Sequence, residues 1–157
     1  MVCSCWLTAP ENDDFSQRIP ISGVEARATG HLIGATREVG EPIHSRRAVG
    51  HSAWWTWTAP DDGLADWTVT GTSFNFYPVI AAYRGSSLVD LEQILAGDSP
   101  SDLHFRVRAG ETVQLALDTQ HAELEGDYTL SLKVEPLAPE LDSAPTRLTD
   151  GSTQFRV

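Results

Sequence analysis

The sequence predicts an all-β protein of about eight short strands, with the pattern of an antiparallel β-sandwich or barrel. Most segments alternate apolar and polar residues with a period of two, which turns one face of a strand to a core and the other to solvent. Clusters of Gly, Pro, Asp and Ser separate these segments at short intervals, as turns do. The chain has 157 residues, of which 41% are hydrophobic and 21% charged, enough for one domain with a substantial core.

Eight segments have this strand-like character. In chain order they are residues 24–29, 31–36, 52–58, 64–70, 78–83, 104–108, 112–118 and 128–134. The first two segments, on either side of Gly30, show the strand-like alternation least clearly. The segment 52–58 is rich in aromatic and β-branched residues, which favour strands. A further segment, 87–95, has the i, i+3 and i+4 apolar spacing of a helix. Because it is short, we expect a turn or an irregular strand there.

Two flanks differ from this core. Residues 1–10 have no period, and from Pro136 onward the chain reads as an extended linker punctuated by proline before a brief strand-like end. We therefore expect an N-terminal arm over residues 1–10, a β-sandwich domain over 11–135 and an extended C-terminal arm over 136–157.

The charge balance excludes two classes of partner. The chain has 22 acidic and 11 basic residues, a formal net charge of −11, which repels both a phosphate backbone and an anionic membrane surface. No stretch approaches the ~20 apolar residues of a membrane span. The first residues lack the cationic and apolar regions of a signal peptide, so either a signal was removed or the chain is not secreted by that route. Cys3 and Cys5 lack the second ligand pair of a zinc site, and we interpret them as incidental thiols.

Motifs of catalysis are absent from the sequence. There is no Gly-x-Ser-x-Gly nucleophile elbow, no His-Glu-x-x-His and no Gly-rich phosphate loop. We therefore expect no enzymatic activity and no catalytic residues.

Several segments together resemble a known family. They are Glu11–Phe15, Ile19–Gly23, 34–38, 40–42, Ser52–Pro60, Ala82–Leu88 and Gly126–Leu132. In this order they resemble the bacterial pre-peptidase C-terminal domain and its relatives, including the collagen-binding domains of collagenases. The resemblance covers about residues 11–135, and Trp-Trp-Thr-Trp-Thr-Ala-Pro and Gly-Asp-Tyr-Thr-Leu are its most specific parts. It implies a jelly-roll-like sandwich without catalytic machinery, appended to larger proteins for adhesion, substrate targeting or secretion.

The resemblance also implies a calcium site in the acidic segment before the first strand. The matching positions are Glu11, Asn12, Asp13 and Asp14, with Glu38 and Glu41 as partners from the next loops. Calcium takes six to eight oxygen ligands, which carboxylates from neighbouring loops supply. The same Asn-Asp-Asp sequence is also common at turns, and this alternative stays open. We expect no cofactor other than calcium.

One long polar loop is a candidate contact surface. It carries His44, Arg46, Arg47 and His51, a basic group too small for nucleic acid and with no established metal-ligand spacing. Binding residues concentrate on loops, so we predict a binding role for these four side chains.

The tryptophan cluster divides between two faces of one strand. Alternation places Trp55 and Trp57 on one face, which we predict to be part of the core, and Trp54 on the opposite face. Trp54 is therefore predicted to be an exposed platform for a ligand.

Two functions remain open at this point. The first is a non-catalytic module that mediates adhesion or assembly through its loops and terminal arms, with a protein or polysaccharide partner, outside the cell or at its surface. The second is a structural decoration or cement subunit of a virus capsid or another large assembly, docked by its tails. In that case Phe155 and Val157 belong to an end that adds a strand to a neighbour's sheet.

Overall fold

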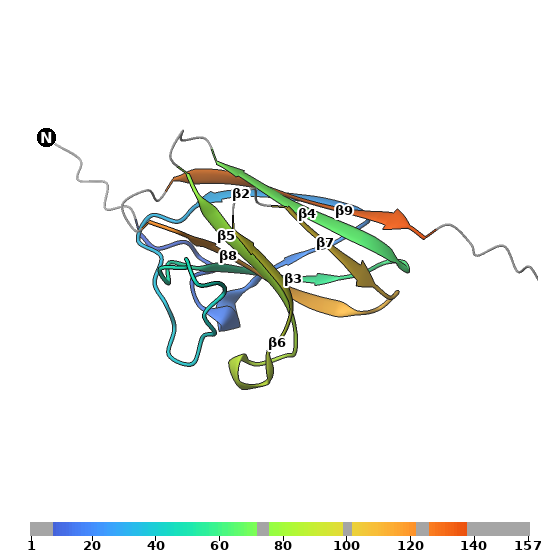
Figure 1. Ribbon diagram of the computed structural model, residues 1–157, viewed down its shortest axis with the longest axis horizontal. Coiled ribbons are helices and arrows are strands. Elements are labelled where there is room, and N and C mark those ends of the chain that lie inside the picture. Colours follow the sequence, from blue (N-terminus) through green and yellow to red (C-terminus); the bar gives the residue numbers. More distant parts are fainter. Residues whose placement is uncertain (1–7, 72–75, 99–101, 122–125, 138–157) are drawn as a thin grey trace, which may run out of the picture.

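A computed structural model describes residues 8–71, 76–98, 102–121 and 126–137. Within these ranges nine strands form two facing sheets, so the predicted all-β sandwich is confirmed (Figure 1). The strands are β1 (Ile19–Ile21), β2 (Glu25–His31), β3 (Ala53–Thr58), β4 (Gly63–Gly71), β5 (Pro78–Arg84), β6 (Glu92–Asp98), β7 (Asp102–Val107), β8 (Thr112–Thr119) and β9 (Asp127–Pro136). Two short 3₁₀ helices, η1 (Phe15–Gln17) and η2 (Leu88–Asp90), complete the described part.

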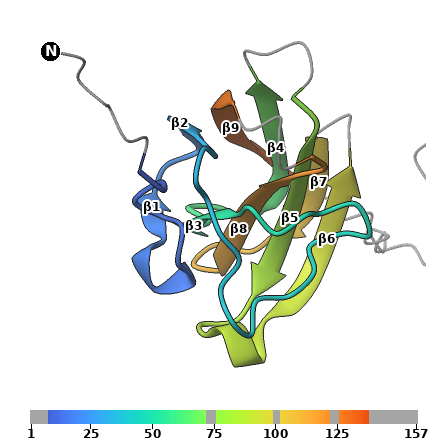
Figure 2. The ribbon, with the colours of Figure 1, turned by 90° about the vertical axis from the view of Figure 1, so that its left-hand side faces the viewer.

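The two sheets are built almost entirely from antiparallel pairs. One sheet has the order β1-β3-β8-β5-β6 and the other the order β2-β9-β4-β7. Only β1 and β3 pair in parallel among the described strands. Strands β1 and β2 are edge strands of different sheets and lie on the same side of the sandwich (Figure 2). No helix in the described ranges has the length and apolar character of a membrane span.

Seven of the eight predicted strands are confirmed, and two segments differ from the prediction. The strand predicted over 31–36 is wrong, because β2 ends at His31 and a long loop follows. The three-residue strand β1 was not predicted. The segment 87–95 contains η2 and the start of β6, whose pairing with β5 shifts register at Ala82 and Tyr83, so the expected irregular strand is confirmed.

The main core fills the space between the sheets. Trp55 and Trp57 contribute from β3 and Trp67 from β4, each with at most 1% of its surface exposed, together with apolar residues of β5, β7, β8 and β9. The prediction that Trp55 and Trp57 pack in the core is confirmed. Their burial removes the largest apolar surfaces of the chain from water, which is the main favourable contribution to folding.

A second, smaller core lies on the outer side of the five-stranded sheet. Phe15, Trp54, Tyr83, Ala81 and Ala116 form it. The loop 32–52 runs across this side of the sheet (Figure 2) and covers it. The outer side of the four-stranded sheet has no such loop over it in the described ranges.

Candidate functional site

The candidate site is built on the tight turn between β7 and β8, at one end of the sandwich. The backbone N–H of Glu111 donates to the carbonyl of Arg108 at 2.9 Å, and the Glu111 carboxylate accepts from the N–H of Arg108, also at 2.9 Å. Gly110 has a φ of 80°, a left-handed conformation that favours glycine. The sequence Arg108-Ala109-Gly110-Glu111 therefore closes this turn locally.

A neighbouring turn, between β3 and β4, holds the first one in place. Ala59 donates its N–H to the carbonyl of Glu111 at 2.9 Å and accepts from the N–H of Gly110 at 2.8 Å. The Asp62 carboxylate accepts from the N–H of Ala109 at 2.8 Å. Because three hydrogen bonds join the two turns, side chains at residues 106–111 start from a fixed backbone, which lowers the entropy lost on binding.

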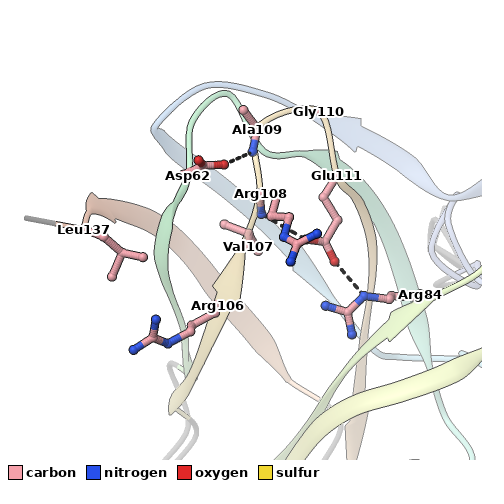
Figure 3. A pocket seen from close by; sticks show the side chains of 9 residues that line it. All are labelled: Asp62, Arg84, Arg106, Val107, Arg108, Ala109, Gly110, Glu111 and Leu137. Carbon is pink, nitrogen blue, oxygen red and sulfur yellow. Dashed lines mark hydrogen bonds and ion pairs between the residues drawn. The ribbon is translucent and has the colours of Figure 1, made fainter. Parts of the chain in front are cut away.

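The two turns border a pocket of about 690 Å³ at the surface (Figure 3). Its lining is Asp62, Arg84, Arg106, Val107, Arg108, Ala109, Gly110, Glu111 and Leu137. Three guanidinium groups meet two carboxylates there, so the pocket carries a net positive charge on a protein whose net charge is −11. A pocket of this volume lies in the range of ligand sites, ~300–1,000 Å³.

Both carboxylates of the pocket already have partners. Arg84 Nε lies 2.6 Å from one Glu111 oxygen, the other Glu111 oxygen takes the Arg108 N–H, and Asp62 takes the Ala109 N–H. In contrast, the guanidinium groups of Arg106 and Arg108 have no hydrogen-bond or ion-pair partner among the described residues. Both side chains are exposed, and Leu137, 45% exposed, adds an apolar wall.

This arrangement is suited to binding an anion. A guanidinium offers a planar fork of N–H donors that matches a carboxylate or a similar oxyanion, and such charge-assisted hydrogen bonds are the stronger ones. The described lining holds no Ser, Thr, Cys, His or Lys, so its charged groups are guanidinium groups and carboxylates alone. The site therefore has the groups for recognition of an oxyanion.

The predicted calcium ligands are mostly engaged by the protein itself. Asp13 accepts from the backbone N–H and the hydroxyl of Thr36 at 2.6 and 2.8 Å, and Glu38 accepts from the N–H of Phe15 at 3.0 Å. Asn12 is buried and donates to the carbonyl of Trp54 at 2.8 Å.

These contacts tie the acidic segment to the loop after β2. The structure places Glu11 at the surface, Asp14 before η1 and Glu41 in the interior. No group of three His, Cys, Asp or Glu residues in the described ranges is arranged to hold a metal ion. The calcium site stays a prediction.

The prediction that Trp54 is exposed is wrong. Trp54 does lie on the face opposite Trp55, but it has 0% exposure, because the loop 32–52 covers that face. Its ring packs edge-on against Phe15 at 5.0 Å and against His44 at 5.2 Å, measured between ring centroids. Trp54 is therefore part of a core and offers no surface to a ligand.

His44, predicted to belong to a contact surface, is buried instead. His44 is 2% exposed, with Nε2 at 2.8 Å from a Glu41 oxygen and Nδ1 at 2.7 Å from the Tyr83 hydroxyl. The Ser52 hydroxyl donates to the same Glu41 oxygen. Burial raises the pKa of Tyr83 above its usual value, and the charges of Glu41 and Asp118 add to this effect.

The remaining predicted binding residues fall into two groups. Arg46 and Arg47 are exposed on the loop 32–52, and Nε of Arg47 lies 3.9 Å from an oxygen of Asp98. His51 is partly buried, and its backbone N–H donates to the Asp118 carboxylate. Phe155 and Val157 lie outside the described residues. The role of these residues stays a prediction.

Comparisons with known proteins agree with the fold. No family model matches the chain, and no curated protein sequence matches it either. Among solved structures, the chain is similar to the pre-peptidase C-terminal domain of a collagenase from Bacillus anthracis, with a TM-score of 0.54, 15% identity, and 74% of this chain and 94% of that domain covered. It is also similar to the mitogen of Yersinia pseudotuberculosis, with a TM-score of 0.50, 14% identity, and 75% and 92% of the two chains covered. The resemblance to the pre-peptidase C-terminal domain noted in the sequence therefore extends to the fold.

Proposed function

We propose that this chain is a non-catalytic interaction module whose sandwich presents the arginine-lined pocket to carboxylate groups of a partner protein. The observation that carries the proposal is that Arg106 and Arg108 are unpaired within the described structure and stand on a turn held by three hydrogen bonds to its neighbour. Exposed guanidinium groups on a rigid backbone bind oxyanions without the entropic cost of ordering the turn.

The chemistry of the pocket favours an acidic protein segment with an apolar residue beside its carboxylates. Leu137 lines the pocket, and Leu64 pairs across the strands with Arg106 and is partly exposed, so apolar surface adjoins the two guanidinium groups. Arginine beside apolar surface is typical of protein interfaces. A location outside the cell or at its surface is part of this proposal, supported by the fold shared with a collagenase domain.

The test is a titration with a tetraglutamate peptide, followed by heteronuclear NMR. The double variant Arg106→Gln/Arg108→Gln is expected to weaken binding about tenfold or more, because each lost hydrogen bond to a charged group contributes ~1.5–3 kcal/mol. The matched control is Arg27→Gln/Lys133→Gln, which removes the same formal charge from exposed side chains outside the pocket.

Two other outcomes of this titration would contradict the proposed site or change the proposed partner. Equal weakening in both double variants would show that net charge alone attracts the peptide, which would overturn the pocket as the site. Binding of an oligogalacturonate without binding of the peptide would place the carboxylates on a polysaccharide. The alternative function, a decoration subunit docked by its tails, depends on residues outside the described ranges and stays a prediction.

The calcium hypothesis has a separate test. If the acidic segment at residues 11–14 binds calcium together with Glu38 or Glu41, calcium stabilises the folded state by mass action and raises the melting temperature relative to a sample with chelator. An unchanged melting temperature at millimolar calcium would contradict the hypothesis.

A further inference from the structure

β9 ends beside the arginine-lined pocket (Figure 3). β7 and β9 both pair with β4 in antiparallel orientation, so they run in the same direction and finish at the same end of the sheet. Gly63 of β4 pairs with Val107 on one side and with Pro136 on the other, which places the three residues in one row. Neighbouring strands lie about 4.8 Å apart, so Pro136 is roughly 10 Å from Val107. Leu137 comes next and lines the pocket, so the chain that follows Leu137 starts there.

The sequence directly after Leu137 carries the groups that this pocket is suited to bind. Residues 138–145 read Ala-Pro-Glu-Leu-Asp-Ser-Ala-Pro, with two carboxylates, an apolar residue between them and no basic residue. Glu140 is three residues beyond Leu137, and three extended residues span up to ~10 Å. Glu140 can therefore reach the guanidinium groups of Arg106 and Arg108, which are exposed and have no partner among the described residues.

The spacing of the opposite charges matches as well. Arg106 and Arg108 are two residues apart at the end of β7, and in an extended chain side chains at i and i+2 point the same way, roughly 7 Å apart. Glu140 and Asp142 have the same separation, in a segment that the sequence predicts to be extended. Two carboxylates can therefore meet two guanidinium groups at once, and the first pair holds the second at a high effective concentration.

A second motif of the same kind starts at the wrong end of β9. Glu123-Leu124-Glu125 precedes this strand, whereas Glu140 follows it. β9 has 10 residues. A strand of that length separates the two motifs by about 30 Å. Of the two, only the segment after Leu137 adjoins the pocket.

We propose that Glu140 and Asp142 occupy the arginine-lined pocket of their own chain by pairing with Arg106 and Arg108, and that a partner displaces them when it binds. This inference rests on the proposed function, because it concerns the same pocket. Exposed ion pairs are individually weak, and a short linker gives an effective concentration of about 1 mM, so the segment occupies the pocket in only a fraction of the molecules. It lowers the apparent affinity for a partner in proportion to the fraction of pockets that remain free.

The test compares the unaltered chain with the variant Glu140→Gln/Asp142→Asn by ¹⁵N NMR, reading the backbone amide signals of residues 106–111 during a titration with tetraglutamate. The variant is expected to move these signals before any peptide is added and to bind the peptide about two- to fivefold more tightly. The matched control is Glu123→Gln/Glu125→Gln, which removes the same charge from the motif before β9 and is expected to do neither. Equal effects in the two variants would show that net charge alone acts, which would overturn the inference.

The same spectra separate this inference from the proposed function. If the peptide binds the unaltered chain and Glu140→Gln/Asp142→Asn equally, and the signals of residues 106–111 coincide in the two, the proposed function stands and the contact with the chain's own segment is refuted. If the signals differ but the peptide binds neither protein, the contact within the chain stands and the proposed partner is refuted.

Dilution distinguishes a contact within one chain from a contact between two copies. A contact within one chain leaves the signals of residues 106–111 independent of protein concentration, because it is not a bimolecular equilibrium. Signals that approach those of Glu140→Gln/Asp142→Asn on dilution would place the segment on a second copy and overturn the contact within one chain.

Discussion

At the scale of single residues, polar side chains in the interior decide how the loop 32–52 is held. Glu41 and His44 come from the loop, and both contact each other in the interior, with side chains 1% exposed. His44 also contacts the hydroxyl of Tyr83 on β5, and the hydroxyl of Ser52 donates to the Glu41 carboxylate. At the other end of the loop, the Asp118 carboxylate on β8 accepts from the N–H groups of Gly50 and His51. Such buried groups stabilise a structure only as long as every member keeps its partners.

His44→Ala is therefore expected to destabilise the fold by roughly 3 kcal/mol, because it leaves Glu41 short of a partner in the interior and opens a cavity beside Trp54. Urea denaturation measures this change. The control is His104→Ala on β7, whose exposed ring lies 3.7 Å from Asp66 and 3.4 Å from Asp102. Since exposed ion pairs contribute little, His104→Ala is expected to change stability by about 0.5 kcal/mol or less. Equal losses in the two variants would contradict the role of the interior contact.

At the scale of elements, alternation predicts those strands that pack one face into the core between the sheets. In β4, β7 and β9 every second residue is buried, and the sequence shows the same alternation. Alternation fails for β1, which has three residues with a central proline and exists because Ile19–Ile21 pairs with Trp55–Trp57 far along the chain. It is also ambiguous for β6, where a register shift against β5 disturbs the pattern.

For the functional residues, too, local sequence patterns predict which face of a strand a side chain is on but not what covers that face. Alternation correctly separates Trp54 from Trp55, but whether the second face meets solvent depends on a loop that crosses it from residues 32–52. The alternation of residues 104–108 places Arg106 and Arg108 on the same outward face, so the sequence alone could have identified them as a pair. Their pocket was not predictable, because Arg84, Asp62 and Leu137 reach it from three other parts of the chain.

At the scale of the whole molecule, the two sides of the sandwich are unlike. The five-stranded sheet is covered on its outer side by a loop with its own small core, and the four-stranded sheet presents a polar outer side, as in the shallow hollow lined by Asp66, Thr68, Ser131 and Lys133. Buried phenol groups take part in both cores, Tyr83 in the outer one and Tyr128 between the sheets. The stability of the whole domain should therefore respond to alkaline pH.

Burial raises the pKa of both phenols above the usual value of 10, and for Tyr83 the charges of Glu41 and Asp118 raise it further. In the unfolded chain both phenols ionise near pH 10. The unfolded state then releases protons that the folded state keeps, so stability is fully present below about pH 10 and is lost as the pH rises from there toward the raised pKa values of the folded state.

The expected loss of unfolding free energy is about 1.4 kcal/mol per pH unit for each phenol, or about 2.8 kcal/mol per pH unit for the two. Urea denaturation between pH 9 and 11.5 measures this slope. Tyr128→Phe is expected to lower it by about half. Tyr83→Phe lowers it similarly, and because this variant also removes the hydroxyl that contacts His44, it shifts stability at neutral pH as well. A double variant that kept the full slope would show that groups other than these two phenols govern the alkaline loss of stability.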